Sequence, residues 1–188
     1  MRIAVLALQG AFAEHERTLR SLGAETFEIR NLSDWEEEKD GLVIPGGEST
    51  TQMKLLRGLG LLSPVRESVA AGLPVFGTCA GLILLSRHVE NDGMETLATM
   101  DITARRNAYG RQLGSFHTMG SVTGVGEGIP MTFIRAPYVE SVGEGVEILS
   151  KVDGRVVAAR QGRQLVTSFH PELDNDTRVH KFFLDMIG

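Results

Sequence analysis

Short apolar runs alternate with amphipathic stretches along the first half of the chain. Ile3–Leu8 is an unbroken apolar run, which is typical of a strand buried on both faces of a parallel sheet. A helix is predicted to follow over Ala11–Leu22, because its apolar positions share one side and Gly23 supplies a stop signal. Further strands are predicted at Glu25–Arg30, Gly41–Pro45 and Leu73–Gly77, and further helices from Ser49, from a Ser63 cap to Gly72, and over Leu82–Ser86. Strands that alternate with helices in this way predict a doubly wound α/β sheet.

The pattern changes to short strands with tight turns after about residue 100. Strands are predicted at Asp101–Arg105, Ser115–Thr123, Thr132–Arg135, Val146–Val152, Arg155–Arg160 and Gln164–Phe169. Asp153-Gly154 is a hairpin signal between two of them. The last apolar residues recur at helical spacing and predict a final helix with one core face: Val179, Phe182, Phe183, Met186 and Ile187. We therefore expect one domain over residues 1–188, in which a mostly parallel sheet carries a small antiparallel extension.

Composition and charge exclude several classes of protein. An apolar fraction of 42% over 188 residues is enough for a substantial core and argues against disorder. The 24 acidic and 19 basic side chains give a net charge of −5, so nucleic acid and anionic membranes are not expected partners. No apolar run approaches the roughly 20 residues of a membrane span, and no signal-peptide pattern is present, so we expect a cytoplasmic protein. The histidines and the cysteine show no metal-ligand spacing, and we expect neither a metal nor a cofactor.

The single cysteine, Cys79, lies in a sequence that favours a nucleophile. A lone cysteine cannot form an internal disulfide and is most often a small buried apolar residue. However, Gly77-Thr78-Cys79-Ala80-Gly81 joins a predicted strand to a predicted helix, which is the arrangement of a nucleophile elbow. Glycine on either side leaves room for the sharp turn, and the positive end of the helix favours the thiolate. We therefore interpret Cys79 as a nucleophile rather than a core residue.

A base for this nucleophile is predicted where the last strand ends. His170 follows that strand and Glu172 comes two residues later. Side chains at positions i and i+2 of an extended segment point to the same side, and Pro171 is expected to keep the segment extended. The carboxylate can then fix the imidazole tautomer and stabilise its charged form. Taken singly, His170 is explained as a packed histidine and Glu172 as a carboxylate ahead of the last helix, but together with the elbow they predict a Cys-His-Glu triad.

Acyl transfer also requires N–H donors for the developing oxyanion. One donor is expected from Ala80, the residue directly after the nucleophile. The second is expected from Gly46-Gly47, which follows the third strand at the same carboxyl edge of the sheet. Read alone, Pro45-Gly46-Gly47 is an ordinary turn. It lacks the Gly-Lys-Ser/Thr ending that a phosphate-binding loop requires.

The order Cys, His, Glu on an α/β sheet resembles the class I, triad-type glutamine amidotransferases. Six strings, spread from the first strand to the last helix, narrow this resemblance to the glutaminase subunits of pyridoxal 5′-phosphate synthase. They are Leu8-Gln9-Gly10-Ala11 with His15, Pro45–Thr51, Gly77–Leu82, Arg106–Gln112, Phe133–Pro137 and Ser168–Leu173. The elbow and His-Pro-Glu are shared by the wider superfamily, whereas Gly-Gly-Glu-Ser-Thr, Arg-Asn-x-Tyr-Gly-Arg-Gln and Ile-Arg-Ala-Pro are more specific.

The resemblance implies a flavodoxin-like fold and the hydrolysis of L-glutamine to L-glutamate and ammonia. It implies that Cys79 is the nucleophile, that His170 and Glu172 form the relay, and that Gly47 and Ala80 hold the oxyanion. The residues implied to hold glutamine are Gly47, Glu48, Ser49, Arg106, Ile134 and Arg135. The arginines suit the carboxylate of glutamine, and Glu48 suits its ammonium group.

The resemblance also implies a partner. A barrel-shaped synthase, in a large hetero-oligomer, would condense the ammonia with ribose 5-phosphate and glyceraldehyde 3-phosphate to form pyridoxal 5′-phosphate. In this family Gln9 and Gly10 lie by the oxyanion site and the partner interface. We therefore expect that glutamine turnover is poor until the synthase binds.

Three other interpretations remain open at this stage. A glutaminase of another pathway, such as imidazole glycerol phosphate synthase, would share Cys79, His170 and Glu172. A non-catalytic scaffold subunit would retain the fold but would not be acylated at Cys79. A cysteine peptidase or stress protein on a related elbow fold would not need the Arg106–Gln112 segment.

Overall fold

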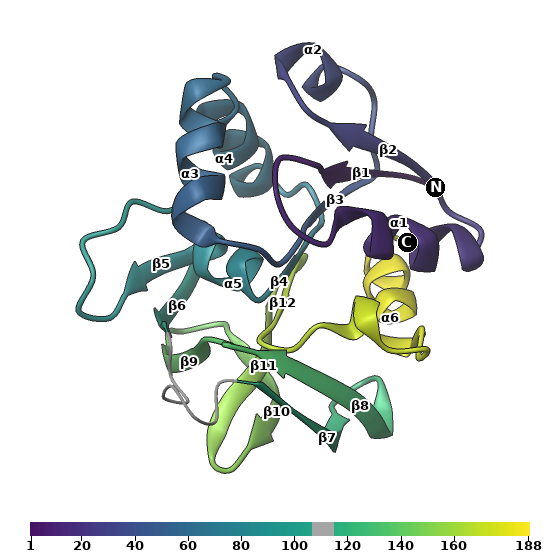
Figure 1. Ribbon diagram of the computed structural model, residues 1–188, viewed down its shortest axis with the longest axis vertical. Helices are drawn as coiled ribbons and strands as arrows, with labels where there is room; N and C mark the ends of the chain where they lie inside the picture. The colour runs from purple at the N-terminus through teal and green to yellow at the C-terminus, as the bar shows by residue number, and fades with distance from the viewer. Residues whose placement is uncertain (107–114) are drawn as a thin grey trace.

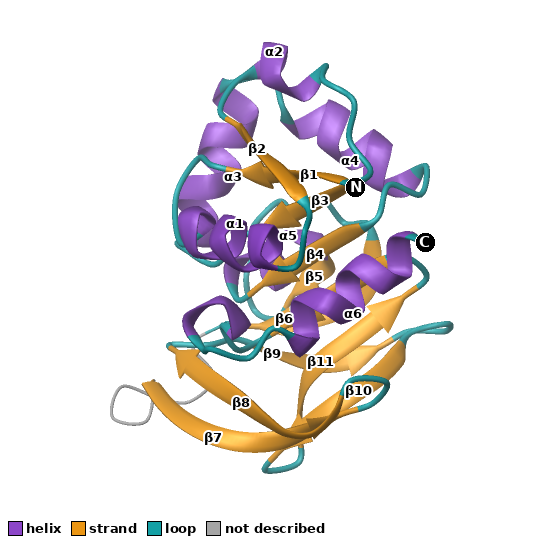
Figure 2. Ribbon diagram, turned by 90° about the vertical axis from the view of Figure 1, so that its right-hand side faces the viewer, coloured by secondary structure: helices purple, strands orange, loops and turns teal. Residues whose placement is uncertain are grey.

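The computed structural model describes residues 1–106 and 115–188. Within these residues, ten strands form one sheet: β1 (Arg2–Leu6), β2 (Glu25–Ile29), β3 (Gly41–Ile44), β4 (Val75–Thr78), β5 (Ser86–Val89), β6 (Met100–Arg105), β9 (Tyr138–Val142), β10 (Glu147–Val152), β11 (Arg155–Gln161) and β12 (Gln164–Thr167). Their order is β2-β1-β3-β4-β12-β11-β9-β6-β5, and β10 pairs with β11. A second sheet pairs β7 (Ser115–Val122) with β8 (Gly126–Ile134) and curves beneath the first (Figure 2).

Helices cover both faces of the main sheet (Figure 1). They are α1 (Phe12–Ser21), α2 (Leu32–Trp35), α3 (Ser49–Gly58), α4 (Leu62–Ala70), α5 (Ala80–Leu85) and α6 (Arg178–Ile187), with a short 3₁₀ helix, η1, at Pro171–Leu173. On one face α3, α4 and α5 bury residues such as Leu56 and Val65, and on the other α1 and α6 bury Leu19 and Phe183. No helix in the described ranges is long and apolar enough to cross a membrane.

The strand order places four loops at one edge of the sheet. β2, β1, β3, β4 and β12 run parallel to one another, so their carboxyl ends meet. From β1 the chain passes to β2 on one side, and it then returns to add β3 on the other side of β1. Open α/β sheets bind their ligands at such a switch point. The register between β4 and β12 pairs Thr78 with Thr167. Cys79 therefore leaves the sheet beside Ser168, two residues before His170.

The expected fold class is confirmed, with the boundaries of most elements shifted by a few residues. Asp153 and Gly154 both have positive φ angles, 49° and 77°, in the turn between β10 and β11, as the hairpin signal predicted. The strands β5 and β9, helix α2 and residues 126–131 of β8 were not predicted. The antiparallel strands β9 and β11 continue the main sheet, and among the strands of residues 1–106 and 115–188 only β7 and β8 stand apart.

The predicted cap at Ser63 is wrong. Helix α4 begins at Leu62 with Leu61 as the capping residue, and Ser63 lies inside the first turn. Leu61 is fully buried and the helix has no side-chain cap hydrogen bond. The predicted end is confirmed, because Gly72 follows the helix with a φ of 107°.

Candidate active site

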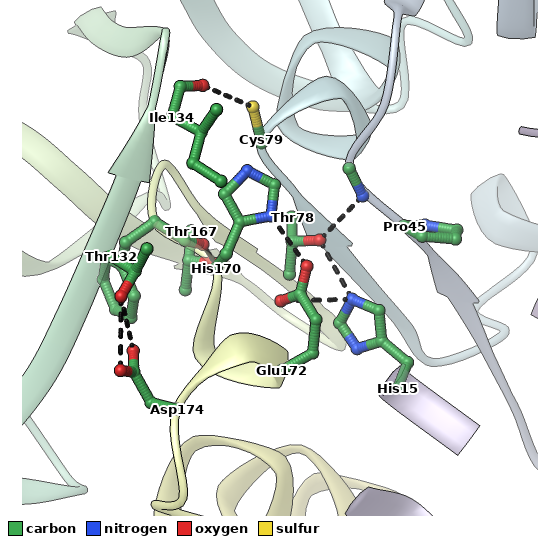
Figure 3. A network of polar contacts seen from close by, with 12 residues as sticks. His15, Pro45, Thr78, Cys79, Thr132, Ile134, Thr167, His170, Glu172 and Asp174 are labelled. Atoms are coloured by element: carbon green, nitrogen blue, oxygen red, sulfur yellow. Dashed lines mark hydrogen bonds and ion pairs between the residues drawn. The ribbon is translucent and has the colours of Figure 1, made fainter. Parts of the chain in front are cut away.

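A cleft of about 380 Å³ opens at the carboxyl edge of the sheet. It is lined by nine of the residues predicted for the site: Gly47, Glu48, Ser49, Cys79, Ala80, Arg106, Ile134, Arg135 and His170. The tenth, Glu172, is 1% exposed and lies behind His170 (Figure 3). Within the described ranges, no group of three or more His, Cys, Asp or Glu side chains is arranged to hold a metal ion.

Cys79 has the backbone geometry of a nucleophile elbow. Its φ is 50° and its ψ is −98°, a conformation that residues with a side chain rarely adopt and that is common at active sites. A Cβ added to Gly77 would lie 2.7 Å from the carbonyl carbon of Gly81, and one added to Gly81 would lie 2.2 Å from the Ile44 oxygen. Both flanking glycines are therefore needed for the turn. Ala80 begins α5, so the cysteine lies at the positive end of that helix.

His170 and Glu172 are in contact beside the cysteine. His170 Nδ1 lies 2.7 Å from Glu172 Oε1, and the His170 amide donates to the Thr132 oxygen at 2.8 Å. Pro171 begins the 3₁₀ helix η1, so the expected extended segment is wrong. The fixed φ of proline suits the first position of a helix. The turn of η1, rather than strand alternation, brings the carboxylate back to the imidazole.

The charges of this pair reinforce each other. Burial opposes protonation of the imidazole, but its hydrogen bonds to the Cys79 sulfur and the Glu172 carboxylate raise the pKa of His170 to about 10. Burial likewise opposes ionisation of Glu172, yet His15 and the hydrogen bond from His170 hold its pKa below the ordinary value. His170 is therefore a cation at neutral pH, and a cation beside the sulfur favours the thiolate.

Gly47 lines the cleft, and Gly46 packs against His170 and Cys79 beside it. A Cβ on Gly46 would lie 2.3 Å from His170 Cε1 and 3.3 Å from Cys79 Cβ, so no larger residue fits there. The Gly46 oxygen accepts a hydrogen bond from the Ala11 amide at 3.2 Å. Because a trans peptide directs its N–H away from its C=O, the Gly47 N–H points away from Ala11. In the described part of the chain neither this N–H nor that of Ala80 donates a hydrogen bond.

The residues predicted to hold glutamine lie around the cleft rim. Glu48 caps α3, accepting from the Thr50 amide at 3.2 Å and the Thr51 amide at 2.7 Å. Although burial opposes it, hydrogen bonds from Thr51 and Thr50 hold the pKa of Glu48 below its usual range. Arg106 Nη2 lies 3.5 Å from Glu48 Oε1, and Arg106 Nη1 lies 2.8 Å from Asp92 Oδ2. The guanidinium is thus fixed at the rim by two carboxylates.

Of the remaining predicted binding residues, Ser49 begins α3, and Ile134 and Arg135 lie at the end of β8 and directly after it. Ile134 ends β8 and is 41% exposed, with its carbonyl oxygen 4.0 Å from the Cys79 sulfur. Arg135 follows with a φ of 43°, which is unusual for a residue with a side chain. Residues 107–112 of the predicted Arg106–Gln112 string lie outside the described residues.

Sequence reasoning missed several residues that build the site. Ile83 and Pro137 line the cleft without a predicted role. Gln52 is fully buried and donates to the Gln9 oxygen at 2.9 Å and the Pro45 oxygen at 3.1 Å, which joins two of the loops. A buried amide on a helix facing two glycine-containing turns is the signal that could have indicated this role. Asp92, the partner of Arg106, lies in a segment without a motif.

Comparison with known proteins supports the same interpretation. Residues 5–188 match the SNO glutamine amidotransferase family. The chain belongs to this family. Its relatives include the pyridoxal 5′-phosphate synthase subunit PdxT of Methanocorpusculum labreanum, 62% identical over 188 residues, with 100% of this chain and 98% of the relative covered. The subunit of the same name from Desulfitobacterium hafniense is 57% identical, with 100% and 94% covered. The resemblance stated from the sequence is confirmed.

Solved structures also match the fold. A crystal structure described as a glutamine amidotransferase superposes with a TM-score of 0.93 at 43% identity, covering 99% of this chain and 98% of that one. A structure of PurLQS from Thermotoga maritima has a TM-score of 0.64 at 14% identity, covering 100% of this chain and 99% of that one. The second likeness is one of fold alone.

Proposed function

We propose that this chain hydrolyses L-glutamine to L-glutamate and ammonia through a thioester on Cys79, and that it delivers the ammonia to the barrel subunit of pyridoxal 5′-phosphate synthase. The observation that carries the proposal is the cleft in which an elbow cysteine meets a hydrogen-bonded His170–Glu172 pair, in a chain of a glutamine amidotransferase family. The lone cysteine also fits a reducing compartment such as the cytoplasm.

Acylation begins with the thiolate of Cys79. The sulfur attacks the carboxamide carbon, and the carbonyl oxygen becomes an oxyanion that the Gly47 and Ala80 N–H groups stabilise. When the C–N bond breaks, His170 gives its Nε2 proton to the departing nitrogen, which leaves as ammonia. His170 is then neutral, and the glutamyl group is held as a thioester.

Deacylation reverses these roles. Neutral His170 takes a proton from water, whose oxygen attacks the thioester carbon through a second oxyanion. Collapse of that intermediate breaks the C–S bond, restores the thiolate and releases glutamate with its new carboxyl proton lost to solvent. The ammonia must then reach the synthase without being protonated, because ammonium is not a nucleophile. This requirement supports a tightly bound partner in a large hetero-oligomer.

Glutamine is held by its two charged groups in this proposal. The guanidinium of Arg106, fixed between Asp92 and Glu48, offers N–H donors to the α-carboxylate. The Glu48 carboxylate, kept ionised by its cap hydrogen bonds, is the acceptor for the α-ammonium group. Ile134 and Arg135 bound the side of the cleft from which the carboxamide approaches Cys79.

The acylation step is expected to remain fast in alkaline solution. His170 must be protonated to release ammonia, and its pKa is raised to about 10. The rate of acylation should therefore stay level from about pH 7 to about pH 9 and fall as the pH rises through about 10, whereas an unperturbed histidine would lose its proton near pH 6.5. The burst of ammonia in a single turnover of the complex with the synthase measures this rate. A decline centred near pH 6.5 would contradict the assignment of His170 as a stably charged acid.

The synthase is expected to stimulate glutamine hydrolysis. The loop that contains Gln9 packs against the Gly46-Gly47 turn, since a Cβ on Gly47 would lie 2.3 Å from Gln9 Oε1. A partner that contacts this loop can therefore adjust the oxyanion site. Glutamate formation should be measured with and without the barrel subunit, with an unrelated barrel protein as the control. Equal turnover in all three mixtures would overturn the proposed partnership.

A further inference from the structure

A chain of buried polar side chains continues behind the triad (Figure 3). The Nε2 atom of His15, on α1, lies 3.4 Å from Glu172 Oε2 and 3.1 Å from Thr78 Oγ1. The other ring nitrogen of His15, Nδ1, lies 2.9 Å from Nε2 of His180 on α6. Both histidines are fully buried. The mechanism described above uses neither of them.

The hydrogen-bond donors and acceptors in this row of buried side chains are compatible with one arrangement of protons. Glu172 Oε2 is buried and makes no hydrogen bond in the described residues, and His15 Nε2 faces it at 3.4 Å. A bare nitrogen at that distance would repel the carboxylate oxygen, so the His15 nitrogen facing it carries a proton. Nδ1 of His15 then accepts, and His180 must donate from Nε2. This leaves His180 Nδ1, which has no partner in the described ranges, as a bare acceptor. If both histidines carried their protons on Nδ1 instead, His180 would bury an unpaired N–H and His15 would direct a nitrogen lone pair at the carboxylate. Each of these costs more free energy than leaving His180 Nδ1 as an unpaired acceptor.

We infer that His15 is a positioning residue for the Glu172 carboxylate and that His180 fixes the tautomer in which it does so. The inference rests on the proposed glutaminase function, since Glu172 acts there through His170. Glu172 then faces an N–H group at both oxygens: His170 hydrogen-bonds Oε1 at 2.7 Å, and the His15 N–H makes an electrostatic contact with Oε2 at 3.4 Å. This contact opposes rotation of the carboxylate away from the imidazole.

The same N–H of His15 is connected to the oxyanion site. Thr78 Oγ1, which lies 3.1 Å from His15 Nε2, accepts the Gly46 amide at 3.0 Å. The loop that carries Gly46-Gly47 is thereby tied to the support of the triad carboxylate. His15 thus positions two parts of the machinery through Thr78 and Glu172, without touching the substrate cleft.

The electrostatics of the histidine pair agree with a neutral donor. Burial lowers the pKa of His15, although Glu172 opposes this, and burial together with His15 lowers the pKa of His180 to about 3. The aromatic ring of Phe76 packs edge-on against both histidine rings, at centroid distances of 5.9 and 5.6 Å. The pair therefore supplies a hydrogen-bond donor inside an apolar surrounding without adding a second buried cation beside His170.

Two substitutions of His15 distinguish the effect of its N–H donor from the effect of its side-chain volume. His15→Leu fills the space but leaves Glu172 Oε2 without a donor, and it should lower kcat for glutamine in the complex with the synthase roughly tenfold to hundredfold, with KM unchanged. His15→Gln can place an amide N–H near the original Nε2 and should recover most of that loss. Phe183→Leu is the matched control. The Phe183 ring packs on the Phe76 ring, with 5.6 Å between the ring centroids, and is apolar, so it forms no hydrogen bond with the buried histidines. It should lower Tm and leave kcat unchanged.

A double-substitution cycle tests the part assigned to His180. If His180 acts only through His15, His180→Phe should lower kcat less than His15→Leu, and the double variant should match His15→Leu alone. Additive losses would contradict the assignment of His180. A kcat within twofold of wild type for His15→Leu, with unchanged Tm, would overturn the role of His15.

The protonation pattern can be observed without any activity. Nitrogen NMR of the full chain labelled at histidine should show both His15 and His180 protonated at Nε2 and bare at Nδ1 at neutral pH. A proton on His15 Nδ1, or on both of its nitrogens, would overturn the inference. If the wild-type complex fails to hydrolyse glutamine, the proposed function fails by itself, while this spectrum still decides the tautomer. A variant that does not fold leaves the same measurement available on the wild-type chain.

Discussion

Replacing Cys79 by alanine should lower glutamine hydrolysis by about 10⁴-fold or more. Alanine has no atom that can form the thioester, so the His170–Glu172 pair has no leaving group to protonate. The elbow itself should persist, because the close contacts that require Gly77 and Gly81 do not involve the sulfur. The loss is measured as glutamate formed by the complex with the synthase at saturating glutamine.

Ammonium chloride provides the control for this variant. Added ammonium bypasses the glutaminase step, so it should restore pyridoxal 5′-phosphate formation by the complex containing Cys79→Ala to the level that the wild-type complex reaches with the same salt. Mass spectrometry after treatment with a glutamine-like electrophile should show labelling of the wild-type chain at Cys79. Hydrolysis by the variant at the wild-type rate would refute the assignment of the nucleophile.

Replacing His170 by asparagine is expected to have the next largest effect, a loss of about 10³-fold in kcat. Asparagine can retain a hydrogen bond to Glu172, but it cannot carry a proton to the departing ammonia or take one from water. Because both steps use this proton, acylation and deacylation should both be slowed. Steady-state glutamate formation in the complex measures the loss.

The same substitution at His88 is the matched control for His170→Asn. His88 lies exposed on β5, outside the cleft, and His88→Asn should leave kcat unchanged. Reaction of Cys79 with a small alkylating reagent should be slower in His170→Asn than in wild type, because the cation beside the sulfur is lost. A kcat for His170→Asn close to that of the His88 control would show that another group moves the proton.

The parallel half of the fold could be predicted because its apolar runs and glycines are compatible with few other secondary structures. Ile3–Leu8 has no polar residue that could face solvent, and Gly23 and Gly72 end their helices with positive φ angles of 87° and 107°. The other half has weaker signals. β5 (Ser86–Val89) follows α5 without an intervening turn residue, and β9 acquires its place by pairing with β6 and β11, which are distant in sequence.

The chemistry of the site was more predictable than its geometry. The steric requirements of the elbow are visible in five consecutive residues, and His-Pro-Glu places the proposed base and its supporting carboxylate two residues apart. The 3₁₀ turn at Pro171 was not predicted, since a histidine and a carboxylate at this spacing can meet in either conformation. The roles of Asp92 and His180 depend on tertiary contacts with Arg106 and His15. Contacts between residues far apart in the sequence cannot be predicted from a local sequence pattern.

Transfer of nitrogen from glutamine into the final product tests the central claim most directly. The complex of this chain with the barrel synthase would be given glutamine labelled with ¹⁵N in its amide, together with ribose 5-phosphate and glyceraldehyde 3-phosphate. Pyridoxal 5′-phosphate has a single nitrogen, so the proposed function predicts that the product carries ¹⁵N in its ring, and that Cys79→Ala abolishes this incorporation. Unlabelled product, or equal labelling without this chain, would contradict the proposal.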